Sequence, residues 1–412
     1  MAKASFRRKN IVLSVTKDPS TLQHITYITQ KNPLKPIKLL IDVGGLSSWV
    51  DCQNVYSSST YKLVQCGTTE CNLAKPIICD DGCTYPGLPK CTQNQCFRDL
   101  YNPPNETYVT FGKVAKDVVL IGRVSDGHRL GQVATIKNFI FTCVPNEDAR
   151  GLTSGAKGFI GLGMSDIALQ IQLSKALGFP QKFGICLSSS SKSKGVIIFG
   201  DGPYYNIDIS KDLVYTPIVT NPHGIGSIKN VSHSSEYYIG VKSIKINGKA
   251  LKINEDLLPI DNVGNGGTKI TTSKPYTILE SSIYRALSVE FLKQLHNVKN
   301  AAPVKPFSHC FDAKSIGRTR VGPEVPTIDL VLQDEAIYWR ILGANSMVQV
   351  NEEVTCLGFV DGGRPYNAIE IGTHQIENNL VQFDLVKRII GFSSSLLLRQ
   401  TTCGNFNFTS HA

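Results

Sequence analysis

Residues 36–52 read PIKLLIDVGGLSSWVDC and place a carboxylate directly after an apolar strand. The apolar run Leu39–Ile41 is followed by Asp42-Val43-Gly44, which has the composition of a turn. Much later, the apolar pair of Phe159-Ile160-Gly161 leads into a segment with helical periodicity. The first half of the chain is therefore predicted to deliver Asp42 to a turn, with a second apolar strand following later in the sequence.

The second half of the chain repeats this order. An apolar strand ends in Glu280-Ser281-Ser282, and Ile369-Glu370-Ile371-Gly372 comes later. Chance repetition among many strands is one interpretation of this repeated order of motifs. The other interpretation is two lobes that meet across a cleft, with Asp42 and Glu280 as the matched carboxylates.

The composition favours a β-dominated globular protein. Of 412 residues, 42% are apolar and 18% charged, which excludes intrinsic disorder. No run approaches the roughly 20 apolar residues that a membrane span needs, and 35 Gly with 20 Pro indicate many turns. Helical periodicity is confined to a few segments, among them Ser281–Leu295, which Ser281 or Ser282 could cap, and a shorter one after Ser165.

The net charge of +10 is spread along the chain. A nucleic-acid-binding protein would show a basic stripe with interleaved aromatic residues, and that pattern is missing. We therefore expect no nucleic-acid partner and no membrane partner. The positive charge favours attraction to an acidic wall or to an acidic protein.

The twelve cysteines indicate disulfides. They are Cys52, Cys66, Cys71, Cys79, Cys83, Cys91, Cys96, Cys143, Cys186, Cys310, Cys356 and Cys403. The early cluster contains no CxxC motif and no histidine at ligand spacing, which disfavours zinc. We expect six disulfides, an oxidising compartment, and no metal or other cofactor. The sequons at Asn105, Asn230 and Asn407 agree with secretion and predict a glycoprotein.

The first ten residues, MAKASFRRKN, lack the apolar core of a signal peptide. For a secreted protein, this leads to the expectation that the sequence begins at or near its mature end.

In its order of motifs the chain resembles the pepsin-like aspartic proteases over essentially its whole length. Besides the two turns, the resemblance rests on Trp49, on Tyr237-Tyr238-Ile239-Gly240-Val241 and on a terminal strand pair at Val381–Phe392. Within that superfamily it is most similar to a plant branch of extracellular dermal glycoproteins, xyloglucan-specific endoglucanase inhibitors, wheat-type xylanase inhibitors and basic 7S globulins. The phrases that carry this likeness are Val15-Thr16-Lys17-Asp18, Ser20-Thr21-Leu22-Gln23, Asp42-Val43-Gly44-Gly45, Trp49-Val50-Asp51-Cys52, Gly200-Asp201-Gly202-Pro203-Tyr204 and Thr401-Thr402-Cys403-Gly404-Asn405-Phe406-Asn407-Phe408.

The resemblance implies an all-β, bilobal acid-protease fold with a few short helices. It implies an N-terminal lobe over residues 1–203, with a Cys-rich insertion at 52–96, and a C-terminal lobe over 204–412. It also implies three disulfides, Cys52–Cys143, Cys186–Cys403 and Cys310–Cys356. Nested pairs Cys66–Cys96, Cys71–Cys91 and Cys79–Cys83 are the corresponding expectation for the early cluster, whose connectivity the spacing does not fix.

The protease site is predicted to be inactive. Aspartic proteolysis needs two carboxylates near 3 Å apart that share one proton. Val43 has no hydroxyl to support such a pair, Glu280 is one methylene longer than Asp, and Ser282 replaces a glycine. The tyrosine of the family's substrate-covering flap has no clear counterpart, although Tyr101 and Tyr108 lie in that part of the sequence. Asp42 and Glu280 are therefore expected to be remnants of a catalytic pair.

The resemblance implies a plant-defence inhibitor of microbial cell-wall glycanases, secreted to the apoplast and cell wall and expected to be monomeric. The expected target is a xyloglucan-specific endoglucanase of glycoside hydrolase family 12, and secondarily a family 11 xylanase. Arg320 in Arg318-Thr319-Arg320-Val321-Gly322-Pro323 matches an inhibitory loop of the family, and Arg399 lies one residue before the position of a second basic contact, which here is Gln400. The alternatives are a basic 7S globulin-like storage or peptide-hormone-binding protein, a polysaccharide-binding wall protein and a weakly active aspartic protease.

Overall fold

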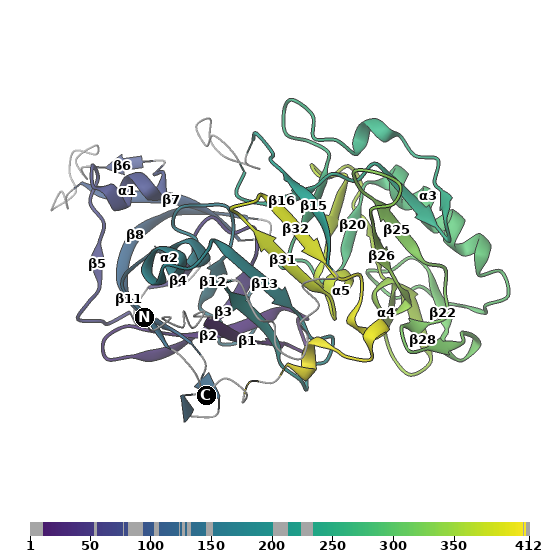
Figure 1. Ribbon diagram of the computed structural model, residues 1–412, viewed down its shortest axis with the longest axis horizontal. Helices are drawn as coiled ribbons and strands as arrows, with labels where there is room; N and C mark the ends of the chain where they lie inside the picture. The colour runs from purple at the N-terminus through teal and green to yellow at the C-terminus, as the bar shows by residue number, and fades with distance from the viewer. Residues whose placement is uncertain are drawn as a thin grey trace, which may run out of the picture.

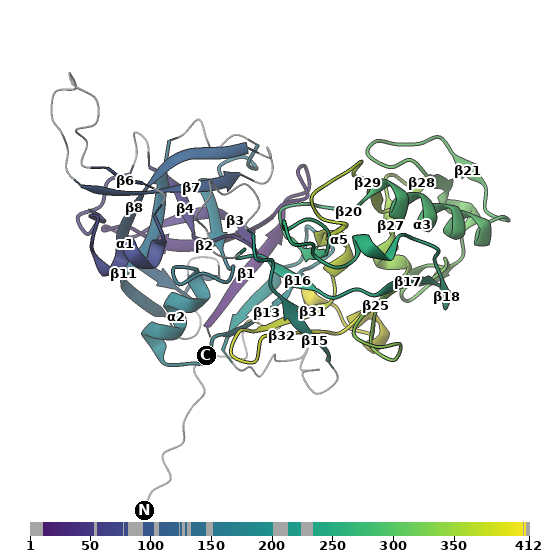
Figure 2. The same cartoon turned by 90° about the horizontal axis from the view of Figure 1, so that it is seen from above.

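The computed structural model describes residues 11–408 apart from 53–55, 77, 81–93, 103–106, 123, 126–127, 130–132, 146–150, 201–212, 224–233 and 407. Two β-rich lobes lie side by side, as Figures 1 and 2 show. The expected fold class, mainly β with a few short helices, is confirmed. The predicted lobe boundary at 203/204 falls within 201–212, outside the described residues.

The first half of the chain contains most of its long strands. Its elements are β1 (Ile11–Lys17), β2 (His24–Gln30), β3 (Lys35–Asp42), β4 (Trp49–Asp51), β5 (Lys62–Leu63), α1 (Thr69–Ala74), β6 (Ile78–Asp80), β7 (Gln95–Asn102), β8 (Thr107–Ile121), β9 (Val124–Ser125), β10 (His128–Arg129), β11 (Ala134–Val144), β12 (Gly158–Gly161), α2 (Leu169–Leu177), β13 (Lys182–Cys186) and β14 (Gly195–Phe199).

The second half has shorter strands and a longer helix. Its elements are β15 (Val214–Val219), β16 (Tyr237–Ile239), β17 (Ser243–Ile246), β18 (Lys249–Ala250), η3 (Glu255–Leu257), β19 (Thr268–Ile270), β20 (Thr277–Leu279), α3 (Ser281–Gln294), β21 (Asn300–Ala301), β22 (Cys310–Asp312), η4 (Ala313–Ser315), β23 (Arg318–Thr319), β24 (Gly322–Pro323), β25 (Ile328–Val331), β26 (Tyr338–Ile341), α4 (Gly343–Ser346), β27 (Met347–Gln349), β28 (Val354–Leu357), β29 (Phe359–Asp361), β30 (Ile369–Ile371), α5 (Thr373–Ile376), β31 (Leu380–Asp384), β32 (Ile389–Phe392), η5 (Leu396–Arg399) and η6 (Cys403–Asn405).

A sheet built from both halves joins the lobes. Its antiparallel order is β1–β14–β13–β31–β32–β15, with β13 of the first half paired to β31 of the second. In Figure 1 the labelled strands β13, β31 and β32 lie between the two lobes. Phe183 and Phe383 stack with ring centroids 4.7 Å apart, and Tyr237 lies 4.5 Å from Phe383. These buried rings bind the two halves into one core, because burial of aromatic surface is strongly favourable.

Each lobe contains the same four-strand unit. In the first, β3 runs parallel to β12, which also pairs antiparallel with β4, and β4 runs parallel to β11. In the second, β19 runs parallel to β30, which pairs antiparallel with β20, and β20 runs parallel to β29. The repeat inferred from the sequence is therefore present in the fold, although the strand matched to β3 is β19.

Both predicted helices form. α2 covers the expected segment after Ser165, and α3 begins at Ser281 as expected. The prediction that Ser281 or Ser282 caps α3 was wrong. The Glu280 side chain is the cap, and it accepts hydrogen bonds from the backbone N–H groups of Ser282 and Ile283 at 2.8 and 3.3 Å. Among the residues that the structure describes, no helix is long and apolar enough to cross a membrane.

Five disulfides are present among the described residues. Cys52–Cys143, Cys186–Cys403 and Cys310–Cys356 are confirmed. The nested pattern expected for the early cluster was wrong, because Cys66 bonds to Cys79 and Cys71 bonds to Cys96. Cys79 reaches Cys66 because β6 pairs with β7, whose first residue Gln95 also bridges to the neighbouring Gln65. Cys83 and Cys91 lie outside the described residues.

Candidate functional site

Asp42 lies at the end of β3, opposite Gly161 of the parallel strand β12. The backbone N–H of Gly44 donates a hydrogen bond to Asp42 Oδ1 at 3.0 Å. A Cβ atom on Gly45 would lie 2.9 Å from Asp42 Oδ2 and 3.0 Å from the Gly161 Cα atom, so this turn favours the glycine. Burial, and next the nearby charge of Glu236, raise the pKa of Asp42 to about 6, against the lowering effect of the Gly44 hydrogen bond.

The residue matched to Asp42 in the second lobe is Thr271. β19 and β30 pair with Ile270 opposite Ile371, so Thr271 follows β19 as Asp42 ends β3. The backbone N–H of Ser273 donates to Thr271 Oγ1 at 3.2 Å, in the same way that Gly44 donates to Asp42. A hydroxyl therefore stands in the position where the twofold repeat would place a second carboxylate.

The prediction that Glu280 is the second remnant of the catalytic pair was wrong. Glu280 follows β20, which occupies the place of β4, so its counterpart in the first lobe is Asp51. Its side chain caps α3 through Ser282 and Ile283. β20 is an apolar run followed by an acid, which is the pattern that the sequence analysis used to match Glu280 with Asp42. The pairing of β19 with β30 shows instead that the turn matched to Asp42-Val43-Gly44 is Thr271-Thr272-Ser273.

Thr272 joins the two turns across the lobe boundary. The backbone N–H of Val43 donates to Thr272 Oγ1 at 3.1 Å, and the Thr272 hydroxyl donates to the Ile41 carbonyl at 2.7 Å. Both Thr272 and Val43 are buried. Val43, at the matched position of the first turn, has no hydroxyl and cannot form the corresponding two hydrogen bonds to the second turn. The Thr272 hydroxyl of the second lobe therefore makes both of the bonds described here.

A buried lysine lies beside this junction. Lys269 Nζ is 3.0 Å from Glu236 Oε1 and 3.0 Å from Glu370 Oε1. Burial alone would lower the pKa of Lys269, but Glu236 and Glu370 hold it well above its ordinary value. Lys269 of β19 pairs with Glu370 of β30. At the matched positions of the first lobe, Leu40 of β3 pairs with Phe159 of β12. A charged pair has thus replaced an apolar pair at matched positions.

Glu236 is the acid that most influences Asp42, and its two oxygens are already engaged. Oε1 contacts Lys269, and Oε2 accepts from the hydroxyls of Tyr238 at 3.0 Å and Ser234 at 3.3 Å. A proton shared between two free carboxylates is the basis of aspartic proteolysis. This site offers Asp42, a threonine at the matched position and a glutamate held by other partners.

Arg320 lies at the tip of the β23–β24 hairpin and is exposed. Thr319 Oγ1 donates to the Gly322 carbonyl at 2.9 Å and accepts from Val321 N–H at 3.2 Å, which closes the turn. The hairpin is fixed to α4, because the Ala344 N–H donates to the Val321 carbonyl at 2.7 Å. Gly322 has φ of 102°, and a Cβ atom there would lie 2.1 Å from the Ala344 nitrogen. The guanidinium is thus carried by a well-supported loop.

Arg399 is also exposed and ends η5. Gln400 follows it in the left-handed conformation with φ of 56°. The loop is anchored on both sides, because Leu396 N–H donates to the Asn378 carbonyl at 2.8 Å and Cys403 N–H donates to Asn378 Oδ1 at 3.1 Å. The Cys186–Cys403 disulfide adds a covalent anchor close to Arg399.

Comparison with known proteins identifies the family. The chain matches the model described as xylanase inhibitor N-terminal over residues 24–201 and the one described as xylanase inhibitor C-terminal over residues 236–394. The chain belongs to the xylanase-inhibitor family. This result confirms the resemblance to pepsin-like proteins of the plant inhibitor and globulin branch.

Several relatives of this xylanase-inhibitor family member align over nearly the whole chain. It is 49% identical to a protein named probable aspartic proteinase GIP2 from Nicotiana benthamiana, over 100% of this chain and 94% of the relative. It is 42% identical to gamma conglutin 1 of Prunus dulcis, over 98% of this chain and 90% of the relative. The crystal structure of edgp has a TM-score of 0.90 at 47% identity, covering 98% of this chain and 99% of that one. The crystal structure of basic 7S globulin from soybean has a TM-score of 0.80 at 33% identity, covering 97% of this chain and 99% of that one.

Sequence reasoning missed Thr271, Thr272 and Lys269. One signal was available, since Gly266-Gly267 directly precedes the short strand β19, whose middle residue is Lys269. The predicted glycosylation sites Asn105, Asn230 and Asn407 lie outside the described residues.

Proposed function

We propose that this protein is a secreted inhibitor of microbial cell-wall glycanases and has no protease activity of its own. The observation that carries the proposal is Arg320, exposed at the tip of a hairpin that α4 supports, in a chain of the xylanase-inhibitor family. The five disulfides favour an oxidising compartment and hence secretion to the apoplast.

The absence of protease activity is inferred from the site. Thr271 stands at the position matched to Asp42, and Glu236 is held by Lys269, Tyr238 and Ser234. A threonine hydroxyl does not ionise in the range where a carboxyl pair shares a proton. Loss of the second carboxylate removes the group that complements Asp42 in activating water.

An exposed arginine suits the active site of a glycosidase. A retaining glycosidase holds two carboxyl groups about 5–5.5 Å apart in an open cleft. The planar guanidinium binds carboxylates with two parallel hydrogen bonds and keeps its charge at all relevant pH values. We propose that Arg320 inserts between such carboxylates in a family 12 xyloglucan-specific endoglucanase, and that Arg399 makes a second contact.

The test is residual activity of a panel of family 12 and family 11 glycanases mixed with the pure protein. We expect inhibition of a family 12 enzyme. Arg320→Ala is expected to weaken inhibition by about 2 kcal/mol, roughly thirtyfold, because a desolvated arginine has the energy of an interface hot spot. The melting temperature should not change, since the side chain is exposed.

Arg285→Ala is the matched control, because Arg285 is an exposed arginine on α3 outside both loops. Equal inhibition by wild type and Arg320→Ala would remove Arg320 from the mechanism. An absence of inhibition across the whole panel would contradict the proposal. That result would favour a storage or peptide-binding role, which the relatives named gamma conglutin and basic 7S globulin support.

A further inference from the structure

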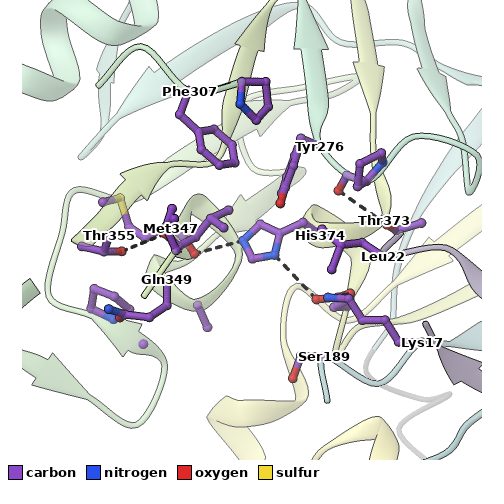
Figure 3. Close-up of a pocket in the computed structure, with 18 of the residues that line it drawn as sticks. Lys17, Leu22, Ser189, Tyr276, Phe307, Met347, Gln349, Thr355, Thr373 and His374 are labelled. Atoms are coloured by element: carbon purple, nitrogen blue, oxygen red, sulfur yellow. Dashed lines mark hydrogen bonds and ion pairs between the residues drawn. The ribbon is translucent and has the colours of Figure 1, made fainter. Parts of the chain in front are cut away.

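A pocket with a volume of about 680 Å³ opens between the two halves of the chain, away from Asp42. Lys17, Leu22 and Ser189 line it from the first half, and Tyr276, Phe307 and His374 line it from the second. Figure 3 shows His374 in the middle of the pocket, with Tyr276 and Phe307 on one side and Lys17 and Ser189 on the other. The volume falls within the range of about 300–1,000 Å³ typical of sites for small organic ligands.

One wall of the pocket is aromatic and held in place. The rings of Tyr276 and Phe307 meet edge to face at 4.6 Å, and those of Tyr276 and His374 at 6.1 Å. His374 Nε2 donates to the Met347 carbonyl at 3.0 Å, which fixes the imidazole ring. Such a preformed wall favours a flat aromatic ligand, because ring contacts add to the free energy gained by burying apolar surface.

Among the described residues that line this pocket, the one acid, Glu377, is already neutralised. Glu377 Oε1 lies 2.7 Å from Lys17 Nζ, and Glu377 Oε2 lies 3.6 Å from His374 Nδ1. Burial alone would raise the pKa of Glu377, but His374, Lys17 and His24 lower it to about 2. Glu377 therefore stays charged and paired with Lys17, and this internal pair adds no net charge to the pocket.

Two further cations at the pocket have no such partner. Lys305 and Arg318 line it and are exposed, and neither forms an ion pair with any residue that the structure describes. Arg318 is on β23, at the base of the hairpin that carries Arg320. The lining therefore carries an excess of positive charge beside an aromatic wall.

We propose that this pocket binds a small aromatic carboxylate, with the ring against Tyr276, Phe307 and His374 and the carboxylate toward Arg318 and Lys305. The positive charge of the lining disfavours cationic ligands. The aromatic wall favours an organic ligand with a ring over a simple inorganic anion. This site shares the β23–β24 hairpin with the glycanase contact proposed for Arg320, but it uses Arg318 at the base of the hairpin, and its test does not depend on inhibition.

The experiment is isothermal titration calorimetry of the full chain at pH 7 and low salt, with 6-hydroxy-2-naphthoate as the probe. Its neutral counterpart, 6-hydroxy-2-naphthamide, has the same rings without the charge. We expect the naphthoate to bind at least about tenfold more tightly than the amide, since hydrogen bonds to a charged group are stronger than those to a neutral one.

The double variant Lys305→Gln/Arg318→Gln is expected to weaken naphthoate binding about tenfold or more, with little change for the amide. Lys252→Gln/Lys293→Gln is the matched control, because both lysines are exposed and lie outside the pocket. The control should bind like the wild type. No binding of the naphthoate, equal affinity for naphthoate and amide, or equal losses in both double variants would overturn the proposal.

Discussion

The matched turns of the two lobes have the same strand pairing and different chemistry. In the first half β3 ends on Asp42 beside β12, and in the second half β19 leads to Thr271 beside β30. The turn hydrogen bonds of Gly44 and Ser273 match, and Thr272 connects the two turns. Strand pairing and the Thr272 hydroxyl therefore hold the two turns together although only the first turn carries a carboxylate.

The largest effect is expected where the two halves differ in charge. In Lys269→Leu, which copies Leu40 of the first lobe, Glu370 and Glu236 lose their shared lysine. We expect a loss of about 3–5 kcal/mol in the free energy of unfolding, because two partly buried acids are left without the buried lysine that they share. Adding Glu370→Leu should recover about half of that loss, since the matched pair in the first lobe is apolar. Urea unfolding of both variants measures this, and no recovery in the double variant would show that the two halves are not equivalent here.

A smaller loss is expected at the hydroxyl that joins the halves. Thr272→Val removes the acceptor of Val43 N–H and the donor to the Ile41 carbonyl, both of which are buried. We expect a loss of about 3 kcal/mol, because two buried backbone groups are left without partners. Thr271→Val is the control, since among the described residues the Thr271 hydroxyl bonds to Ser273 of its own turn and not across the lobe boundary. Equal thermal destabilisation of the two variants would contradict a special role for Thr272.

Asp42 should make stability depend on pH in an unusual direction. Its pKa rises from 3.8 in the unfolded chain to about 6 in the folded protein, so the folded state binds the proton more tightly. The contribution of Asp42 therefore falls as pH rises from about 4 to 6 and stays low above that. Asp42→Asn is expected to remove this fall and to stabilise the protein by about 2 kcal/mol at pH 7. Melting temperatures of both proteins from pH 4 to 8 test this, and parallel curves would contradict it.

The sequence was sufficient for the architecture because the fold is encoded in repeated local patterns. The strand before Asp42, the two apolar pairs before Gly161 and Gly372, and the segments of α2 and α3 all lie where expected. Three disulfides were also correct, since the family resemblance covered the segments that contain those cysteines.

The second half of the site was misassigned for a physical reason. An acid after an apolar strand describes Glu280 as well as it describes Asp42, and only the pairing of distant strands distinguishes β19 from β20. The charge on Lys269 obscured β19 as a buried strand, because its partners Glu236 and Glu370 are distant in the sequence. Similarly, the Cys66–Cys79 bond depends on the pairing of β6 with β7, which cysteine spacing does not reveal.

Peptide hydrolysis by the pure protein is the most direct test of the difference between the two halves. Denatured globin would be incubated with it from pH 3 to 7, with and without pepstatin, and new amino termini would be measured. With Thr271 at the position matched to Asp42, we predict no release of peptides at any pH in that range. Peptide release that pepstatin abolishes would show that Asp42 still has a working partner and would contradict the proposed absence of protease activity.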